Sequence, residues 1–330
     1  MNINKQRKIA AILSILKKSG KPIGSNIISE RLISMGFDLR ERMIRYYLNL
    51  TDEKGMTKNL GRRGHVITNQ GRKELDVAVA IDKVGFVNAR IDELAYRMDF
   101  DESSMTGAII MNMSTIETDS PQHVIKLVTD IMTAKLGMGA YLQIVRAGET
   151  IENPTEKVPD NHIVIGTVCS VTINGILLRH GIHMSSRFGG LLELNEGVPV
   201  RFSQIINYNG STIDPLEIFI KGKMMSVMQA ARTGTGSIGA SFREISIAAL
   251  PDVKRIIENL EKIGLGGVLM IGRPNQPLLD IPVSTGCVGI IVAGGLNPIG
   301  ALEESGIATV NQSLHNLRDF DQLTHIETIA

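Results

Sequence analysis

Tryptophan is absent from this sequence of 330 residues, and aromatic residues make up only 4% of it. Proteins that bind single-stranded nucleic acids stack the bases on aromatic side chains, so the composition argues against a platform of that kind. The two cysteines are too few for a disulfide framework. The first residues, MNINKQRK, lack the apolar core of a signal peptide. We therefore expect a cytoplasmic protein in a reducing environment.

One hydrophobic stretch has the length of a membrane span. Residues 281–302 carry no charged side chain. Glycines and two prolines interrupt this stretch, however, and its β-branched residues cluster in pieces as long as a strand. We expect buried strands and loops here, and no association with a membrane. With 43% hydrophobic residues, the chain can build the cores of two or three domains.

The small net charge of +1 conceals two parts of opposite sign. Residues 1–80 contain 16 Lys and Arg against 7 Asp and Glu, a balance of +9. Residues 81–330 contain 19 against 27, a balance of −8. A basic first quarter is typical of a polyanion-binding domain, whereas the acidic remainder would be repelled by DNA.

Residues 39–50 (LRERMIRYYLNL) predict an amphipathic helix. On a period of 3.6 residues, Ile44, Tyr47 and Leu48 fall on one face. The opposite face carries Arg42, Arg45, Tyr46 and Asn49. Guanidinium, phenol and amide groups form hydrogen bonds with phosphates and with base edges in the major groove. For the helix taken alone, the competing interpretation is a solvated surface helix.

The flanking segments favour the DNA-binding interpretation. Residues 4–18 and 25–36 have the apolar spacing of two further helices, and residues 60–68 read as two short strands joined by a basic tip. Three helices and such a hairpin make a winged helix-turn-helix, whose third helix enters the major groove while the wing touches the backbone. The predicted DNA-binding residues are Arg40, Arg42, Arg45, Tyr46, Asn49, Arg62 and Arg63.

A helical connector is expected at residues 69–82, and an internal repeat follows it. The first half predicts strand 108–116, helix 121–136 and strand 141–146, followed by the segments 163–169 and 176–181. The second half repeats this order with strand 238–247, helix 251–263 and strand 268–273, followed by the segments 281–287 and 290–295. In this alignment Gly137 matches Gly264, Arg146 matches Arg273 and Cys169 matches Cys287.

The expected fold class is therefore α+β. An N-terminal winged helix-turn-helix, residues 1–76, precedes a pseudo-twofold α/β ligand-sensing domain of residues 77–330, built from two β-α-β repeats. The two lobes should form a cleft between them. Three polar, glycine-rich stretches, 178–190, 232–243 and 294–298, can line this cleft.

These stretches predict a site for a small anion. Glycines let backbone N–H groups approach an anion, and Arg binds a carboxylate with two parallel hydrogen bonds. The competing interpretation of each stretch is a tight turn. The predicted ligand-binding residues are Cys169, Arg179, His180, Ser186, Arg187, Thr235, Gly236, Ser237, Arg243, Cys287, Gly294, Gly295 and Asn297.

Other signals carry less weight. Residues 234–239 fit G-x-G-x-x-G, but a dinucleotide site needs a strand before the glycines and a helix after them, which is the reverse of the order here. His180 and His183 lack the further ligands of a zinc site. The cysteines are expected to be inert, and no catalytic constellation is visible. We predict no metal, no cofactor and no catalytic residue.

Several of these motifs resemble one known family. The segments 42–48, 61–68 and 71–75 are similar to the winged helix of the archaeal nitrogen regulatory repressors called NrpR. The stretches 84–87, 179–182, 186–190, 233–239 and 294–298 resemble the regulatory domain of that family, and they are more specific than the wing. The resemblance extends over nearly the whole chain.

The resemblance implies a dimeric transcriptional repressor of nitrogen-fixation and glutamine-synthetase genes, released from palindromic operator DNA by 2-oxoglutarate. This chain would carry one regulatory domain where some relatives carry two. Whether a companion protein with a regulatory domain is needed therefore stays open. The alternative is an enzyme that acts on a small anionic metabolite and is tethered to DNA by its winged helix.

Overall fold

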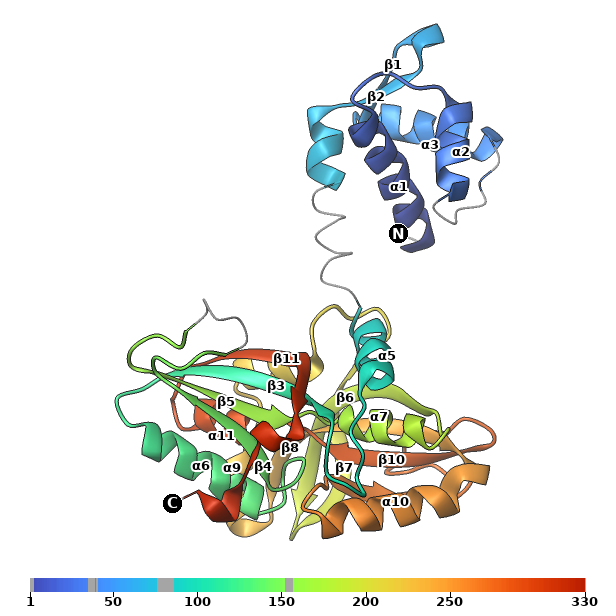
Figure 1. Cartoon of the computed structure of the whole chain (residues 1–330). Coiled ribbons are helices and arrows are strands. Elements are labelled where there is room, and N and C mark those ends of the chain that lie inside the picture. Colours follow the sequence, from blue (N-terminus) through green and yellow to red (C-terminus); the bar gives the residue numbers. More distant parts are fainter. Residues whose placement is uncertain (1–2, 35–38, 40, 76–85, 152–156, 330) are drawn as a thin grey trace. The chain divides into compact units, whose positions relative to one another are not determined.

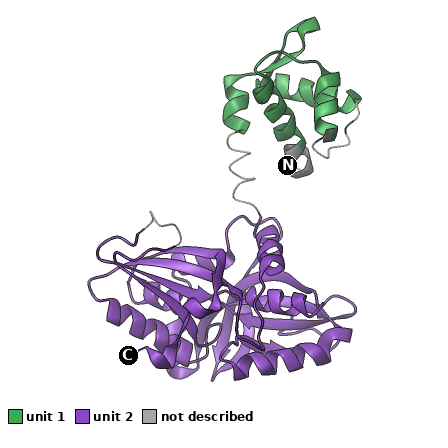
Figure 2. Cartoon of the chain, viewed as in Figure 1, with its two compact units in different colours: residues 1–85 green, residues 86–330 purple. Residues whose placement is uncertain are grey.

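The computed structural model describes residues 3–34, 39, 41–75, 86–151 and 157–329. The chain forms two compact units, residues 1–85 and residues 86–330, which are coloured separately in Figure 2. Among the described residues, no helix is long and apolar enough to cross a membrane.

The first unit begins with three helices. They are α1 (Ile3–Ser19), α2 (Ser25–Ser34) and α3 (Glu41–Glu53) (Figure 1). The apolar spacing seen in the sequence is their buried side: Ile12, Leu16, Ile28, Leu32 and Ile44 are all at most 2% exposed. All three predicted helices are confirmed. Residues 35–38 and Arg40, which include the predicted end of the second helix, lie outside the described residues.

The wing follows α3. Strands β1 (Thr57–Asn59) and β2 (His65–Ile67) pair antiparallel around a 3₁₀ turn, Gly61–Arg63. Ile23 joins this hairpin through an isolated bridge to His65. Gly64 has φ of +95°, and a Cβ there would lie 2.2 Å from the carbonyl oxygen of Ile23, so the bridge requires glycine. Residues 69–75 are helical, in agreement with the predicted connector, whose remaining residues 76–82 are not described.

In the second unit, a series of six elements, β-α-β-β-α-β, occurs twice along the chain (Figure 1). The first copy is β3 (Ala108–Glu117), α6 (Pro121–Thr133), β4 (Tyr141–Arg146), β5 (His162–Val168), α7 (Thr172–Arg179) and β6 (Met184–Asn195). The second is β8 (Gly236–Ser246), α10 (Leu250–Lys262), β9 (Val268–Ile271), β10 (Cys287–Ala293), α11 (Asn297–Glu304) and β11 (Thr309–Asp319). The remaining elements are α5 (Val87–Arg97), β7 (Val198–Asn207), α8 (Pro215–Lys221), α9 (Val227–Thr233) and β12 (Thr324–His325).

The two repeats exchange their last strands. One antiparallel sheet has the order β7-β6-β8-β10-β9, and the other has the order β11-β3-β5-β4-β12. Strand β6 of the first repeat therefore pairs with β8 of the second, and β11 of the second pairs with β3 of the first. Because each sheet is completed by a strand from the other repeat, neither repeat forms its own sheet alone.

The repeat is confirmed, but its unit and its alignment need correction. Each unit is β-α-β-β-α-β, not β-α-β. The match of segment 163–169 with segment 281–287 is wrong, since the first is β5 whereas the strand of the second repeat begins only at Cys287. The match of 176–181 with 290–295 is wrong as well, since the first lies at the end of α7 and the second at the end of β10. Cys169 follows β5 whereas Cys287 starts β10, so the two cysteines do not match. Gly264 matches Lys135 instead of Gly137, because both follow their helices by two residues with positive φ.

The match of Arg146 with Arg273 agrees with the strand register. Ile144 pairs with Ile165 in the first sheet, and Ile271 pairs with Ile290 in the second. Each arginine follows its isoleucine by two residues.

Candidate nucleic-acid interface

Helix α3 has one buried face and one exposed face, as its sequence predicts. Ile44, Tyr47 and Leu48 are buried in the core of the first unit. The other face exposes Arg42, Arg45, Tyr46 and Asn49 to solvent. The hydrophobic effect therefore fixes the rotation of the helix and leaves the hydrogen-bonding groups outside.

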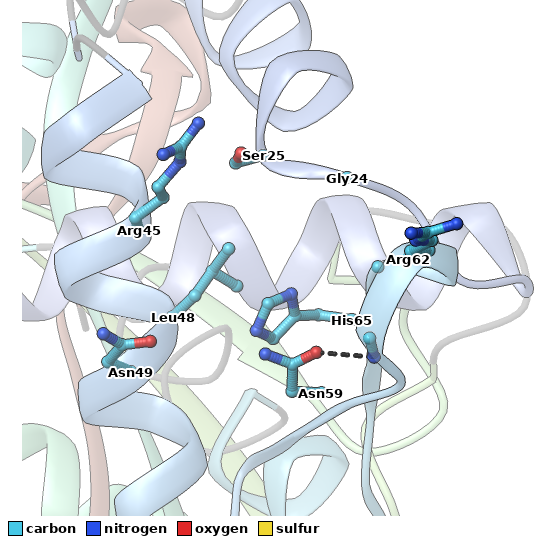
Figure 3. A pocket seen from close by; sticks show the side chains of 10 residues that line it. Gly24, Ser25, Arg45, Leu48, Asn49, Asn59, Arg62 and His65 are labelled. Atoms are coloured by element: carbon cyan, nitrogen blue, oxygen red, sulfur yellow. Dashed lines mark hydrogen bonds between the residues drawn. The ribbon is translucent and has the colours of Figure 1, made fainter.

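A hollow of about 370 Å³ lies between α3 and the wing (Figure 3). Arg45 and Asn49 enter its lining from α3, while Asn59, Arg62 and His65 enter from the wing. Gly24 and Ser25 complete it at the start of α2. Polar groups from three separate segments of the chain thus face one groove.

The wing is tied to the end of α3 by a small polar network. The hydroxyls of Thr51 and Thr57 lie 2.8 Å apart, and Thr57 Oγ1 donates to Asp52 Oδ1 at 2.5 Å. The other carboxylate oxygen of Asp52 lies 3.1 Å from His65 Nε2. Since Thr51 and Thr57 are buried, this network fixes the position of the wing relative to the exposed face of α3.

The start of α3 carries an ion pair that the sequence analysis did not single out. Glu41 Oε1 accepts hydrogen bonds from Arg45 Nη2 at 2.6 Å and from Ser25 Oγ at 2.9 Å. The Arg45 guanidinium and the Ser25 hydroxyl hold the pKa of Glu41 below its usual value. The i, i+4 spacing of Glu41 and Arg45 was the signal for this contact.

The wing tip presents the two predicted arginines. Arg62 and Arg63 are exposed in the 3₁₀ turn, and Asn59 Oδ1 accepts from Gly61 N at 2.8 Å to support that turn. Of the predicted DNA-binding residues, six lie on the exposed helix face or at this tip. Arg40, the seventh, lies outside the described residues. Asn59 and His65 line the groove and were not predicted.

In the second unit, the predicted ligand-binding residues fall into separate groups. Arg243 is fully buried and donates to Ser241 Oγ at 3.1 Å, to Ser170 O at 2.8 Å and to Ser170 Oγ at 2.7 Å. It also donates to Asn174 Oδ1, and Asn174 Nδ2 donates to Ser186 Oγ at 3.2 Å. Arg243 and Ser186 thus share one network.

Burial strongly raises the pKa values of two acidic groups near Arg243. Burial raises the pKa of the Cys169 thiol to about 12, so Cys169 stays protonated. Burial also raises the pKa of Asp214 to about 6, while its hydrogen bond from Leu216 N opposes that shift. The guanidinium of Arg243 interacts electrostatically with both groups.

Arg187, in β6, belongs to a second group, together with Glu244 of β8 and Ser284 of the turn before β10. Its Nη1 donates to Glu244 Oε1 at 2.5 Å and lies 3.5 Å from Ser284 Oγ. Glu244 is only 5% exposed, and Ser284 also donates to it from its N–H and from its hydroxyl. Cys287, which is partly exposed, closes this turn by donating its backbone N–H to Ser284 O at 3.0 Å.

The remaining predicted ligand residues lie elsewhere. Arg179 and His180 are exposed at the end of α7, where His180 Nε2 lies 2.5 Å from Glu102 Oε1. Thr235, Gly236 and Ser237 close the turn between α9 and β8, where Thr235 Oγ1 accepts from Glu196 N and Ser237 N donates to Ser226 Oγ. These contacts hold the junction between α9 and β8, and Gly236 and Ser237 already belong to that strand.

Gly294, Gly295 and Asn297 are buried where α11 packs. A Cβ on Gly295 would lie 2.2 Å from the carbonyl oxygen of Val168. Asn297 Nδ2 donates to Leu136 O and Gly239 O at 2.7 and 2.9 Å. These residues join the two repeats. In the described part of the chain, no three His, Cys, Asp or Glu side chains are placed to hold a metal ion.

Two known families match the two units. Residues 84–325 match the family described as NrpR regulatory domains NRD1 and 2. Residues 10–75 match the family described as the ribonuclease R winged-helix domain. The first match extends over most of the second unit, and the second match contains α2, α3 and the wing.

Relatives of the whole chain carry related names. The global nitrogen regulator NrpRI of Methanosarcina mazei is 35% identical over 97% of this chain and 98% of its own length. The NrpR regulators of Methanococcus maripaludis and Methanocaldococcus jannaschii are 30% and 31% identical. The chain matches 54% and 51% of the length of these two relatives, which is about half.

A solved structure agrees with the second unit. The crystal structure of a nitrogen repressor-like protein from Methanococcus jannaschii matches 73% of this chain and 98% of its own chain, with a TM-score of 0.62 and 26% identity. These relatives are named as global nitrogen regulators or as a nitrogen repressor-like protein.

Proposed function

The chain belongs to the NrpR family of global nitrogen regulators, and from this premise we propose that it represses nitrogen-assimilation genes by binding palindromic operator DNA as a dimer. The genes in question are those for nitrogen fixation and glutamine synthetase. We further propose that 2-oxoglutarate, which accumulates when nitrogen is scarce, releases the repressor. A winged-helix nitrogen regulator is the established part of this description, and it is a regulator, not an enzyme.

The observation that carries the DNA-binding part is the groove between α3 and the wing. Arg45 and Asn49 on the exposed face of α3 suit base edges, whereas Arg62 and Arg63 at the wing tip suit phosphates. The balance of +9 over residues 1–80 supplies the attraction to DNA.

Replacing Arg62 or Arg63 by alanine should weaken binding to all DNA sequences by a similar factor. Each lost phosphate contact should reduce the slope of log K against log salt concentration by about one unit. Fluorescence anisotropy on a short duplex at several salt concentrations measures this slope. Arg255→Ala removes an exposed arginine from α10, where it contacts Asp252, and is the matched control. An unchanged slope for both wing variants would contradict this docking.

We expect a homodimer on an inverted repeat. One winged helix contacts a short half-site, and specific affinity at cellular salt usually needs two half-sites about one helical turn apart. The second unit should supply most of the dimer contact. Its edge strand β7 exposes Val198, Val200 and Ile205, which are 57%, 48% and 50% exposed.

Light scattering of residues 81–330 should therefore give twice the mass of the monomer at micromolar concentration. Replacing Ile205 by glutamate tests whether β7 contributes to the contact, since a buried unpaired carboxylate would be costly. Asp252→Ala on the distant helix α10 is the control. A monomeric mass for the unaltered unit would contradict the assignment of the dimer contact to this unit.

The proposal for 2-oxoglutarate comes from the family and is supported here by chemistry alone. A dicarboxylate needs cationic and N–H donors, and the second unit offers Arg187 and Arg179 as partly exposed cations in an otherwise acidic region. A companion protein with a regulatory domain is a further proposed partner, since two of the relatives are about twice as long as this chain.

A further inference from the structure

Three polar residues form one column on the exposed face of α3. Glu41, Arg45 and Asn49 succeed one another at intervals of four residues, so they lie one above the other along the helix. Arg45 and Asn49 line the groove between helix and wing, and Glu41, the first residue of α3, precedes them in the column and contacts the groove-lining residues Arg45 and Ser25. A carboxylate therefore lies beside the surface that is proposed to meet DNA.

Glu41 forms an ion pair with Arg45. The two side chains are joined at 2.6 Å while 47% of Glu41 and 67% of Arg45 remain exposed. An exposed ion pair of this kind is weak and easily exchanged for a better partner. A phosphate can approach Arg45 only beside the negative charge of Glu41, whereas a base edge can satisfy both groups at once.

Ser25 fixes the carboxylate of Glu41 from the other side. Its hydroxyl donates at 2.9 Å from the first residue of α2. Ser25 itself lines the groove. Glu41 is therefore held at a defined position relative to the groove, which a base-reading group requires.

We propose that Glu41 is a specificity-determining residue of the DNA interface. On DNA of the wrong sequence it keeps Arg45 paired and repels the phosphates. On the correct half-site Arg45 exchanges Glu41 for the O6 and N7 acceptors of a guanine, and Glu41 accepts a hydrogen bond from the N4 amino group of a cytosine. This inference rests on the proposed DNA binding and adds the residue that restricts it.

The variants Glu41→Gln and Glu53→Gln test the proposal. Both remove one negative charge from α3, but Glu53 is the last residue of the helix, exposed and away from the groove. Glutamine at position 41 keeps an oxygen that can accept from Ser25 and Arg45, so the helix start should stay folded. Full-length protein is used throughout.

The probe is a duplex obtained by selection from a randomised library with the unaltered protein, together with a scrambled duplex of the same composition. Glu41→Gln should bind the scrambled duplex more tightly and lower the ratio of selected to scrambled affinity by about 5- to 150-fold, the range of one base contact. The lost discrimination should concern one C·G position of the half-site. Glu53→Gln should leave the ratio unchanged.

Equal changes in affinity for both duplexes in Glu41→Gln, as expected of charge alone, would overturn the proposal. Arg45→Ala and the double variant complete the test. If Glu41 acts together with Arg45, the double variant loses less discrimination than the sum of the single losses, and additive losses contradict the proposal. Failure of the unaltered protein to enrich any sequence would instead contradict sequence-specific DNA binding itself.

Discussion

Replacing Arg243 by alanine should destabilise the second unit by about 3 to 5 kcal/mol. The side chain is fully buried, and its guanidinium donates to acceptors of Ser170, Asn174 and Ser241. Alanine would leave these acceptors without donors and would open a cavity of almost the size of the lost side chain. Both effects act in the same direction.

Urea unfolding of the chain measures this loss as a lower midpoint for the second unit with an unchanged slope. Arg255→Ala, an arginine with 63% side-chain exposure on α10, should change the free energy of unfolding by less than about 0.5 kcal/mol. If Arg243→Ala unfolds at the same urea concentration as the unaltered protein, Arg243 is not a structural residue. It would then return to the candidates for effector binding.

Addition of 2-oxoglutarate should weaken operator binding, and operator DNA should weaken 2-oxoglutarate binding by the same factor. Thermodynamic linkage requires this equality, and typical coupling corresponds to about 5- to 150-fold. Operator affinity is measured by anisotropy with and without the metabolite, and metabolite affinity by calorimetry with and without the selected duplex. Two unequal factors would show that the metabolite does not act by shifting one equilibrium between two states.

Arg187→Ala should bind operator normally and no longer release it when 2-oxoglutarate is added. The contact of Arg187 with Glu244 does not prevent this experiment, because Ser284 still donates two hydrogen bonds to Glu244 in the variant. Arg201→Ala, which removes an exposed arginine paired with Glu193, is the control. A variant that keeps the full response places the effector elsewhere, and His180 is the next position to replace.

The winged helix could be predicted from the sequence almost completely. Its helices bury Ile44, Tyr47 and Leu48 on one side, and such periodicity is visible without any knowledge of distant contacts. The sequence signal for the wing was equally local, since Gly61 and Gly64 flank the two arginines of its tip. The pair of Glu41 and Arg45 also had a local signal in its i, i+4 spacing. The predicted DNA-binding face contained only cationic and neutral polar residues, so Glu41 was absent from it.

The second unit was predictable in its elements and not in its pairing. Strand β3 begins at Ala108 and helix α6 at Pro121, as expected. Which strand lies beside β3 depends on contacts about 200 residues apart, between Ala108 and Asp319 for example, and no local pattern encodes them. The predicted alignment of the cysteines failed for a different reason, because it matched like residues although Cys169 follows β5 and Cys287 begins β10.

The ligand residues show a different limit. Arg187 and Arg243 both stand in polar, glycine-containing stretches, yet one is 41% exposed in its side chain and the other fully buried. The composition of such a stretch does not distinguish a buried, hydrogen-bonded arginine such as Arg243 from an exposed one such as Arg187, which a ligand can reach. The cleft expected between the two repeats remains a prediction. Because its predicted residues are dispersed over several segments, the smaller set around Arg187 is the better candidate for the effector site.

Exchange of β6 and β11 also governs the order in which the chain can fold on the ribosome. The winged helix is complete within the first 85 residues and can fold soon after they emerge. The sheet that contains β3 is complete only after β11, which ends at Asp319, has been synthesised. Until then the edge of β3 that pairs with β11 has no partner strand. Contacts of such sequence separation slow folding and expose strands to aggregation. A nascent chain stalled between β10 and β11 should therefore carry a native winged helix together with an unfinished second unit.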